Sequence, residues 1–411
     1  MNILYINHYA GSISMGMEFR PYYLAKEWLK QGHNVRIVGA SFSHLRSKNP
    51  QVTQDFEIQN IEGIEYQWIK TSQYQGNGVK RAVTMFQFCS KLWLNAKKLV
   101  KDFNPDVVIA SSTYPLDTYP AQRIAKIANI KYVHEVHDMW PITPIELYNM
   151  PVWHPFVVVM QIAENSFCKY ANKVVSILSH AKEHLIEHGM KSEKFEFISN
   201  GIRLEDWRKN ATLPEEHQSV FDYAHSQNKV IITFFGSHTR SYSLDYLLKA
   251  ISNIDRKKLC VVFVGEGNYK DELIKMSKEL GLDDGCCYFL PKIPKNAIPH
   301  LLENTDISYV GAIRNRMFRF GIGMNKLFDA MMGGKPILYA VDAPNNMIEQ
   351  YNCGVTVEAE NSEDLKNGIE KLLQLTCEER IQMGENGRKA VIENFNYTVL
   401  SKKFLDVIDE I

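Results

Sequence analysis

The chain has 411 residues, of which 45% are apolar and 23% charged, a composition that is ordinary for a soluble globular protein. This length exceeds what one hydrophobic core comfortably supports, so we expect two domains. Basic and acidic residues balance at 47 each, which leaves no global field that would favour a nucleic-acid partner.

In the first half, short β-branched runs alternate with helical patterns. The expected strands are 2–6, 34–40, 106–111, 131–136 and 173–178, and a last strand with an Asn-Gly turn lies in 192–202. Such alternation is typical of a parallel, doubly wound sheet. The N-terminal strand lacks the basic segment and long apolar block of a signal peptide.

The stretch 205–228 is polar and aperiodic, and we interpret it as a linker. Alternation then resumes, with strands expected in 230–236, 259–265, 286–290, 306–311, 335–340 and 353–358. The predicted architecture is α/β, with two Rossmann-like domains of doubly wound parallel sheet, at 1–208 and 209–394. The helix at 395–411 is expected to pack back on the first domain.

The cysteines and the longest apolar run indicate the compartment. Seven cysteines include no CxxC pair and no cysteine–histidine spacing typical of a metal site, so we expect free thiols and a cytoplasmic protein. The apolar run 155–163 is too short to span a bilayer. The longer stretch 150–170 is either a core helix or a face that lies on a membrane surface.

Two common phosphate-binding motifs are absent. Gly265 and Gly267 follow an expected strand without the third glycine of a dinucleotide fingerprint, and no P-loop pattern occurs. Both nicotinamide-dependent hydride transfer and P-loop phosphoryl transfer therefore lose support. Ligands of open α/β sheets bind beyond the carboxyl ends of the strands, so we expect the active site in a cleft between the domains.

The stretch "GIGMNKLFDAMMGGKPIL" (321–338) predicts an anion site. Asn325 and Lys326 open a helix whose N-terminus already favours negative charge, so a cation there indicates a bound anion. Arg240 follows an earlier strand, and Arg314, Arg316 and Arg319 precede the glycines; each arginine alone is as well explained by a solvated surface. Together these residues predict a diphosphate site. Asp329 either accepts hydrogen bonds from ribose hydroxyls or pairs with Lys326.

Several motifs in the same order resemble the retaining glycosyltransferases of family four, which have the GT-B fold. They are "EVHDMWP" (135–141), "SNGI" (199–202), "VGEG" (264–267) and the stretch 321–338. The similarity is greatest to the subgroup that resembles bacterial N-acetylfucosamine transferases of surface-polysaccharide synthesis. The resemblance implies a nucleotide-sugar donor and a glycan or lipid-linked acceptor.

The resemblance also implies residue roles: His137 and Asp138 in catalysis, Gly16 at the donor diphosphate and Glu266 at the nucleoside. From the residue pattern itself we assign Arg240, Arg319, Asn325 and Lys326 to the donor diphosphate and Asp329 to the nucleoside. The sequence departs from the family pattern at three positions. Ser237 and Tyr242 stand where many members have arginine and lysine, and Gly321 stands where they have a glutamate that contacts the donor sugar.

We therefore expect a retaining transfer from a UDP-sugar, with an N-acetylated amino sugar as one option, in surface-polysaccharide synthesis. No strand end offers a DxD pair, so neither metal nor cofactor is expected. Peripheral contact with the cytoplasmic membrane face is expected through 150–170. Two alternatives remain open: a non-hydrolysing UDP-sugar 2-epimerase, and a non-catalytic GT-B partner subunit.

Overall fold

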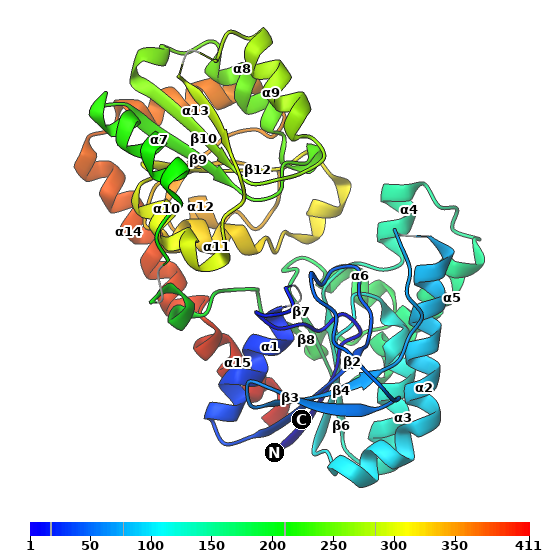
Figure 1. Cartoon of the computed structure of the whole chain (residues 1–411). Coiled ribbons are helices and arrows are strands. Elements are labelled where there is room, and N and C mark those ends of the chain that lie inside the picture. The colour runs from blue at the N-terminus through cyan, green and yellow to red at the C-terminus, as the bar shows by residue number, and fades with distance from the viewer. Residues whose placement is uncertain (17–18, 77, 209–210, 284) are drawn as a thin grey trace. The chain divides into compact units, whose positions relative to one another are not determined.

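The computed structural model describes residues 1–16, 19–76, 78–208, 211–283 and 285–411. The chain forms two compact units (Figure 1), and each is described by itself. Unit 1 comprises Met1–Asn200, Phe320–Gly323 and Tyr397–Ile411, and unit 2 comprises Gly201–Arg319 and Met324–Asn396.

Unit 1 is built on a sheet with the strand order β3-β4-β2-β1-β5-β6-β7-β8. The strands are β1 (Asn2–Ile6), β2 (Asn34–Ala40), β3 (Glu57–Ile61), β4 (Ile64–Ile69), β5 (Val107–Ala110), β6 (Lys131–Val136), β7 (Lys173–Ser176) and β8 (Phe195–Phe197). All neighbours pair in parallel except β3, which is antiparallel to β4. The central strands are buried on both faces, which explains why they read as continuous apolar runs.

The β3–β4 hairpin was not expected from the sequence. Its turn is formed by Glu62 and Gly63, both with positive φ, 53° and 88°. Glutamate is a poor sequence marker for such a turn, because asparagine and aspartate adopt positive φ more readily. In addition, β3 lies at the edge of the sheet and none of its residues is fully buried, so its sequence lacks a strong apolar pattern.

The helices of unit 1 are α1 (Phe19–Lys30), α2 (Val79–Phe103), α3 (Thr118–Ala128), α4 (Ile142–Tyr148), α5 (Pro155–Tyr170), α6 (Lys182–Glu187) and α15 (Tyr397–Asp409). Figure 1 shows α15, the last helix of the chain, beside α1. The indole Nε1 of Trp28 in α1 donates to the carbonyl oxygen of Ser401 at 3.1 Å, and its ring packs edge-on against Phe404. The C-terminal helix therefore completes the core of unit 1.

Unit 2 has a wholly parallel sheet with the order β11-β10-β9-β12-β13-β14. Its strands are β9 (Val230–Phe235), β10 (Leu259–Val264), β11 (Cys287–Leu290), β12 (Ile307–Gly311), β13 (Ile337–Ala340) and β14 (Gly354–Thr356). Its helices are α7 (Glu215–Ser226), α8 (Leu244–Ile251), α9 (Lys270–Glu279), α10 (Ile298–Glu303), α11 (Asn325–Met332), α12 (Met347–Gln350), α13 (Ser362–Gln374) and α14 (Cys377–Asn394). Every strand expected in this half is present.

The interpretation of 205–228 as a linker was wrong, because half of this stretch is α7. His217, Phe221 and Ala224 lie one turn apart on the buried face of this helix. Three buried positions among polar neighbours give only a weak helical periodicity in the sequence, so the helix was not predicted. The expected domain boundary at 208 and 209 adjoins residues 209 and 210, which lie outside the described part of the chain.

Candidate active site

His137 directly follows β6 and is held by two neighbours in unit 1. Its Nε2 lies 2.9 Å from the hydroxyl oxygen of Ser111 and 3.2 Å from Oε2 of Glu135. Ser111 follows β5, and β5 pairs in parallel with β6, so the two strands end side by side. His137 is buried and fixed in orientation at the carboxyl edge of the sheet, where ligands of such sheets bind.

Glu135 is the centre of this buried network. Arg20 donates from Nε to Oε1 at 2.8 Å, and the hydroxyl groups of Tyr5 and Ser111 both donate to Oε2 at 2.5 Å. Burial alone would raise the pKa of Glu135, but the charges of Arg20 and His137 and these hydrogen bonds outweigh it and hold the pKa well below its usual value. The carboxylate therefore remains ionised and orients His137.

The sequence did not identify Glu135, Arg20 or Ser111 as functional residues. One signal was available: a charged residue inside the buried strand "KYVHEV" needs a partner of opposite charge. That partner, Arg20, lies 115 positions earlier in the chain and also donates to the carbonyl oxygens of Ile198 and Ser199. Only the folded topology brings these groups together.

The other two predicted residues of unit 1 are placed differently. Asp138 is exposed and lies on the wall of an apolar groove, described below. Gly16 has φ of +81°, and a Cβ there would lie 2.8 Å from the hydroxyl oxygen of Ser47. Glycine is thus required at position 16 by the backbone and by packing within unit 1. Its contact with a donor phosphate stays a prediction.

In unit 2, Lys326 extends from the first turn of α11 to the carboxyl end of β9. Its Nζ lies 3.3 Å from the ring centroid of Tyr242 and 4.4 Å from that of Phe234. Gly236 has φ of +134°, which side chains rarely adopt, and a Cβ there would approach this Nζ to 2.6 Å and displace the amine. Among the described residues the buried Nζ has no hydrogen-bond partner, and burial lowers the pKa of Lys326 to about 7.

His238 forms a second buried nitrogen group at the same strand ends. Neither of its ring nitrogens has a hydrogen-bond partner among the residues that the structure describes. Burial, together with the charges of Lys270 and Lys326, lowers the pKa of His238 to about 4. Buried polar groups are normally paired, so two unpaired nitrogen side chains near each other indicate a site that an acceptor-rich ligand completes. The sequence did not point to His238.

The glycines of "VGEG" serve the packing of two loops. The loop after β9 donates from the amide of His238 to the carbonyl oxygen of Glu266 at 2.9 Å. A Cβ at Gly265 would lie 1.9 Å from the carbonyl oxygen of Gly236, and one at Gly267 would lie 2.1 Å from that of His238. These glycines allow the backbones that carry the two loops to touch, which fixes the position of His238.

The predicted arginines already have partners on the surface of unit 2. Arg240 is 73% exposed, forms an ion pair with Glu272 at 2.6 Å and lies over the ring of Tyr269. Arg314 pairs with Asp342 and Glu358. Arg319 is exposed and donates to the carbonyl oxygen of Arg316. In this structure Lys326, and none of these arginines, supplies the buried cation.

The three remaining predicted residues also lie in unit 2. Asn325 is exposed at the start of α11. Glu266 is exposed and pairs with Lys270 at 3.0 Å, which lowers the pKa of Glu266. Asp329 is buried, and burial raises its pKa while a hydrogen bond from Trp207 opposes the rise. The alternative of a salt bridge between Asp329 and Lys326 is wrong, because Lys326 Nζ has no such partner.

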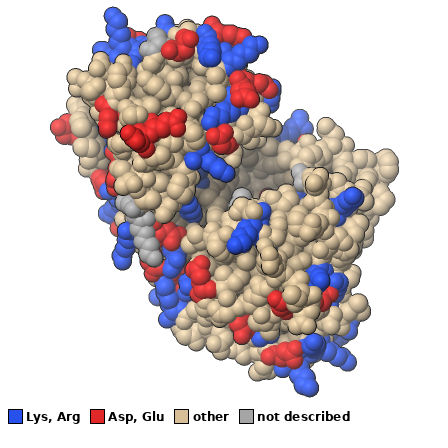
Figure 2. Space-filling model, viewed as in Figure 1, with Lys and Arg blue, Asp and Glu red and all other residues tan. Residues whose placement is uncertain are grey.

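An apolar groove of about 680 Å³ lies in unit 1 between α2, α4 and α5. Its apolar lining includes Val79, Val83, Phe86, Trp140, Tyr148 and Phe156, and Asp138 and Arg81 are on its wall. Val79 is 81% exposed. Trp153, which precedes the lining residue His154 in the sequence, is 75% exposed. Figure 2 shows few charged side chains over α4 and α5. Within the described ranges, no helix is both long and apolar enough to cross a bilayer.

Two family models match the chain, one on each side of the stretch around residue 210. Residues 15–206 match the model described as Glycosyltransferase Family 4, and residues 216–390 match the model described as Glycosyl transferases group 1. A search of curated proteins gave no significant match.

Solved structures show the same fold over the whole length. HepE from Anabaena, in complex with UDP and glucose, aligns with a TM-score of 0.68 at 16% identity and covers 100% of this chain and 99% of its own. Sucrose-phosphate synthase from Thermosynechococcus elongatus gives 0.72 at 14% identity, with 100% and 99% covered. WaaG, a glycosyltransferase involved in lipopolysaccharide biosynthesis, gives 0.63 at 14%, with 99% of each chain covered. The expected fold class, two Rossmann-like domains of GT-B type, is confirmed.

Proposed function

We propose that this chain, a glycosyltransferase of the family-4 type, transfers a sugar from a UDP-sugar to a lipid-linked glycan with retention of anomeric configuration. The observation that carries the donor proposal is the pair of buried, unpaired nitrogen groups of Lys326 and His238 at the strand ends of unit 2. A diphosphate supplies the charge and the acceptor oxygens that these groups lack.

The chemistry needs little covalent help from the protein. Breaking the anomeric bond builds negative charge on the leaving diphosphate, and fixed donors at that position stabilise the charge as it develops. We assign this role to the Lys326 amine, with the free amide groups at the start of α11. Because an amine stabilises the leaving group, we propose transfer without a divalent cation, which would show as full activity in EDTA.

His137 is proposed to contact the reacting sugar, and Asp138 to lie beside the acceptor. The hydrogen bonds to Glu135 and Ser111 fix one nitrogen of His137, so its orientation is set before substrate binds. The departing phosphate oxygen is proposed to take the acceptor's proton, so no dedicated base is assigned. Gly321, which stands where the family has a glutamate, has φ of +96°, a backbone conformation that residues with a side chain rarely adopt.

The donor proposal is tested by isothermal titration with UDP, GDP, ADP and their sugars, using wild type and Lys326→Met. We expect UDP to bind best and the variant to lose most of that affinity. Equal binding of UDP to both proteins would overturn the proposal. For any donor that supports transfer, nuclear magnetic resonance of the glycoside product then determines its anomeric configuration. Formation of an epimer without any acceptor would instead support the 2-epimerase.

For the acceptor, the apolar groove is the supporting feature. It exposes valine, phenylalanine and tyrosine side chains next to Asp138, and such a surface suits the apolar chain of a lipid carrier at the cytoplasmic membrane face. A role in surface-polysaccharide synthesis follows from that acceptor class. An N-acetylated amino sugar is the donor sugar that we propose to test first.

Val79→Asp tests the acceptor class, because Val79 is exposed and its replacement leaves the core intact. We expect kcat/KM for a polyprenyl-diphosphate-linked sugar to fall about tenfold, the value of one lost apolar contact, and kcat/KM for a water-soluble glycan to stay unchanged. Ile381→Asp, at an exposed isoleucine of α14, is the matched control. If Val79→Asp lowers kcat/KM equally for both acceptors, or for neither, the lipid-linked acceptor class is excluded.

A further inference from the structure

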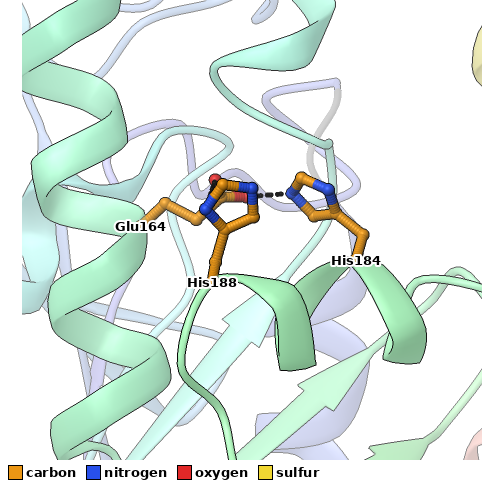
Figure 3. Close-up of side chains that lie close together, drawn as sticks. All are labelled: Glu164, His184 and His188. Carbon is orange, nitrogen blue, oxygen red and sulfur yellow. Dashed lines mark hydrogen bonds and ion pairs between the residues drawn. The ribbon is translucent and has the colours of Figure 1, made fainter.

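Glu164 of α5, His184 of α6 and His188, the residue directly after α6, form a cluster that the proposed reaction does not use. One nitrogen of each histidine and one carboxylate oxygen lie within 4.8 Å of one another. Figure 3 shows the three side chains pointing toward one another, with Glu164 coming from a different helix than His184. The cluster lies wholly within unit 1.

The distances suit a single small ion. Nε2 of His184 lies 2.9 Å from Oε1 of Glu164, and Nδ1 of His188 lies 3.9 Å from Oε2. Ligand atoms that share one tetrahedral zinc ion, at about 2.0–2.1 Å each, are roughly 3.3 Å apart. The two observed values involve different carboxylate oxygens and lie on either side of this spacing, and the three ligand atoms lie within 4.8 Å of one another, so binding of one ion requires the side chains to rotate toward it.

The spacing of the histidines presents both rings on one side of the helix. His184 and His188 are four positions apart, and their ring centroids are 4.3 Å apart. Their side chains are 10% and 27% exposed, whereas Glu164 is 2% exposed, so an ion reaches the buried carboxylate past the histidines. Glu187, between the two histidines in sequence, is exposed and is not among the three candidate ligands.

Gln161 and Asn165 surround the cluster with hydrogen bonds. The side-chain amide nitrogen of Gln161 lies 2.7 Å from Oε2 of Glu164 and 2.9 Å from both Oδ1 of Asn165 and Nδ1 of His188, and this Nδ1 also lies 3.0 Å from Oδ1 of Asn165. An ion bound to Nδ1 of His188 would replace the contacts of that nitrogen with Gln161 and Asn165. Gln161 then holds the carboxylate at 2.7 Å, as outer groups do around metal ligands.

We infer that Glu164, His184 and His188 bind one divalent transition-metal ion, with Zn²⁺ as the best match. Two imidazoles and one carboxylate are a ligand set that zinc favours, with water in the fourth position, whereas Mg²⁺ and Ca²⁺ prefer oxygen ligands only. The bound ion would fasten α6 to α5. The effect would extend further, because the amide of His180 donates to Phe320 and the His184 ring packs against the Phe320 ring.

The test uses tag-free full-length protein, first stripped with EDTA and then dialysed into metal-free buffer. We expect one equivalent of Zn²⁺ to bind, and Co²⁺ to give the visible absorption of a four- or five-coordinate site. Free Zn²⁺ at one hundred times its Kd should raise the melting temperature by roughly 5–10 °C. Mg²⁺ should have no effect.

His184→Gln and His188→Gln should abolish the Co²⁺ spectrum, and Gln161→Ala should weaken Zn²⁺ binding by about tenfold. His225→Gln, at an exposed histidine of α7, is the matched control and should bind as wild type does. Melting curves without metal confirm that each variant folds. Zn²⁺ binding that survives His188→Gln, or a melting temperature that Zn²⁺ does not raise, would show a hydrogen-bonded cluster only and overturn the inference.

Discussion

Glu135 in unit 1 and Lys326 in unit 2, two buried charged groups of the candidate site, are satisfied in opposite ways. In unit 1, Glu135 receives an arginine, two hydroxyl groups and a histidine, so the network is complete without ligand. In unit 2, Lys326 and His238 are buried against aromatic rings and have no hydrogen-bond partner among the described residues. The first arrangement holds a side chain in place, and the second is complete only when an anion binds.

This difference separates stability from binding. Removing a member of the complete network leaves an unpaired buried charge and destabilises the fold. Removing the unpaired amine takes away a group whose burial is itself unfavourable, so stability is retained while affinity for the anion is lost. The following predictions test that separation.

The largest expected effect is on stability, from Glu135→Ala. The variant leaves Arg20 buried without its carboxylate, and we expect the free energy of unfolding to fall by about 3–5 kcal/mol, measured by urea denaturation. Glu272→Ala, which breaks the exposed pair with Arg240, is the matched control and should change it by less than about 1 kcal/mol. Similar losses from both variants would contradict the view that the buried network is the critical one.

Lys326→Met should have the opposite effect to Glu135→Ala: it should weaken UDP binding and leave stability intact. We expect UDP affinity to fall by about 10- to 100-fold, since a hydrogen bond to a charged group contributes about 1.5–3 kcal/mol. The free energy of unfolding should stay constant or rise, because methionine fills the aromatic site without a charge. Titration calorimetry and urea denaturation measure the two quantities. A variant that is both unstable and able to bind UDP would refute the assignment.

The depressed pKa of Lys326 predicts a pH dependence. Its pKa of about 7 in the folded protein lies below its ordinary value of 10.5, so between these values the unfolded chain holds a proton that the native state lacks. Stability should therefore rise as pH increases through this window. Conversely, UDP requires the charged amine, so its affinity should fall by up to about tenfold per pH unit above 7.

Calorimetry at pH 8 in buffers of different ionisation enthalpy measures this linkage. We expect UDP binding to take up close to one proton in wild type and none in Lys326→Met. Proton uptake of the same size in the variant would assign the pH dependence to another group.

Arg240→Ala should have the smallest effect. Arg240 is exposed and already paired with Glu272, so we expect UDP affinity to change by less than about threefold and stability by less than about 1 kcal/mol. A large loss of affinity would show that Arg240 leaves Glu272 and turns to the diphosphate, as the sequence alone suggested.

The sequence predicted the features that local pattern determines. Alternating apolar runs identified every strand except β3 and β4, and the glycine-rich stretch before α11 identified Lys326. It could not identify Glu135, Ser111 or His238, because each depends on partners or neighbours that other strands supply. The sequence also led us to place Arg240 and Arg314 at the diphosphate site. Their acidic partners Glu272, Asp342 and Glu358 lie far away in sequence, so these surface ion pairs could not be predicted.

The position of α15 has a consequence for how the protein is made. Phe404, Leu405 and Ile408 fill the core of unit 1, and they are synthesised only after the whole of unit 2. The N-terminal part of unit 1 therefore waits, with part of its apolar surface uncovered, until α15 has been synthesised. A chain that terminates before α15 should consequently be prone to aggregation or proteolysis, and expressing the first 200 residues alone should not yield a stable product.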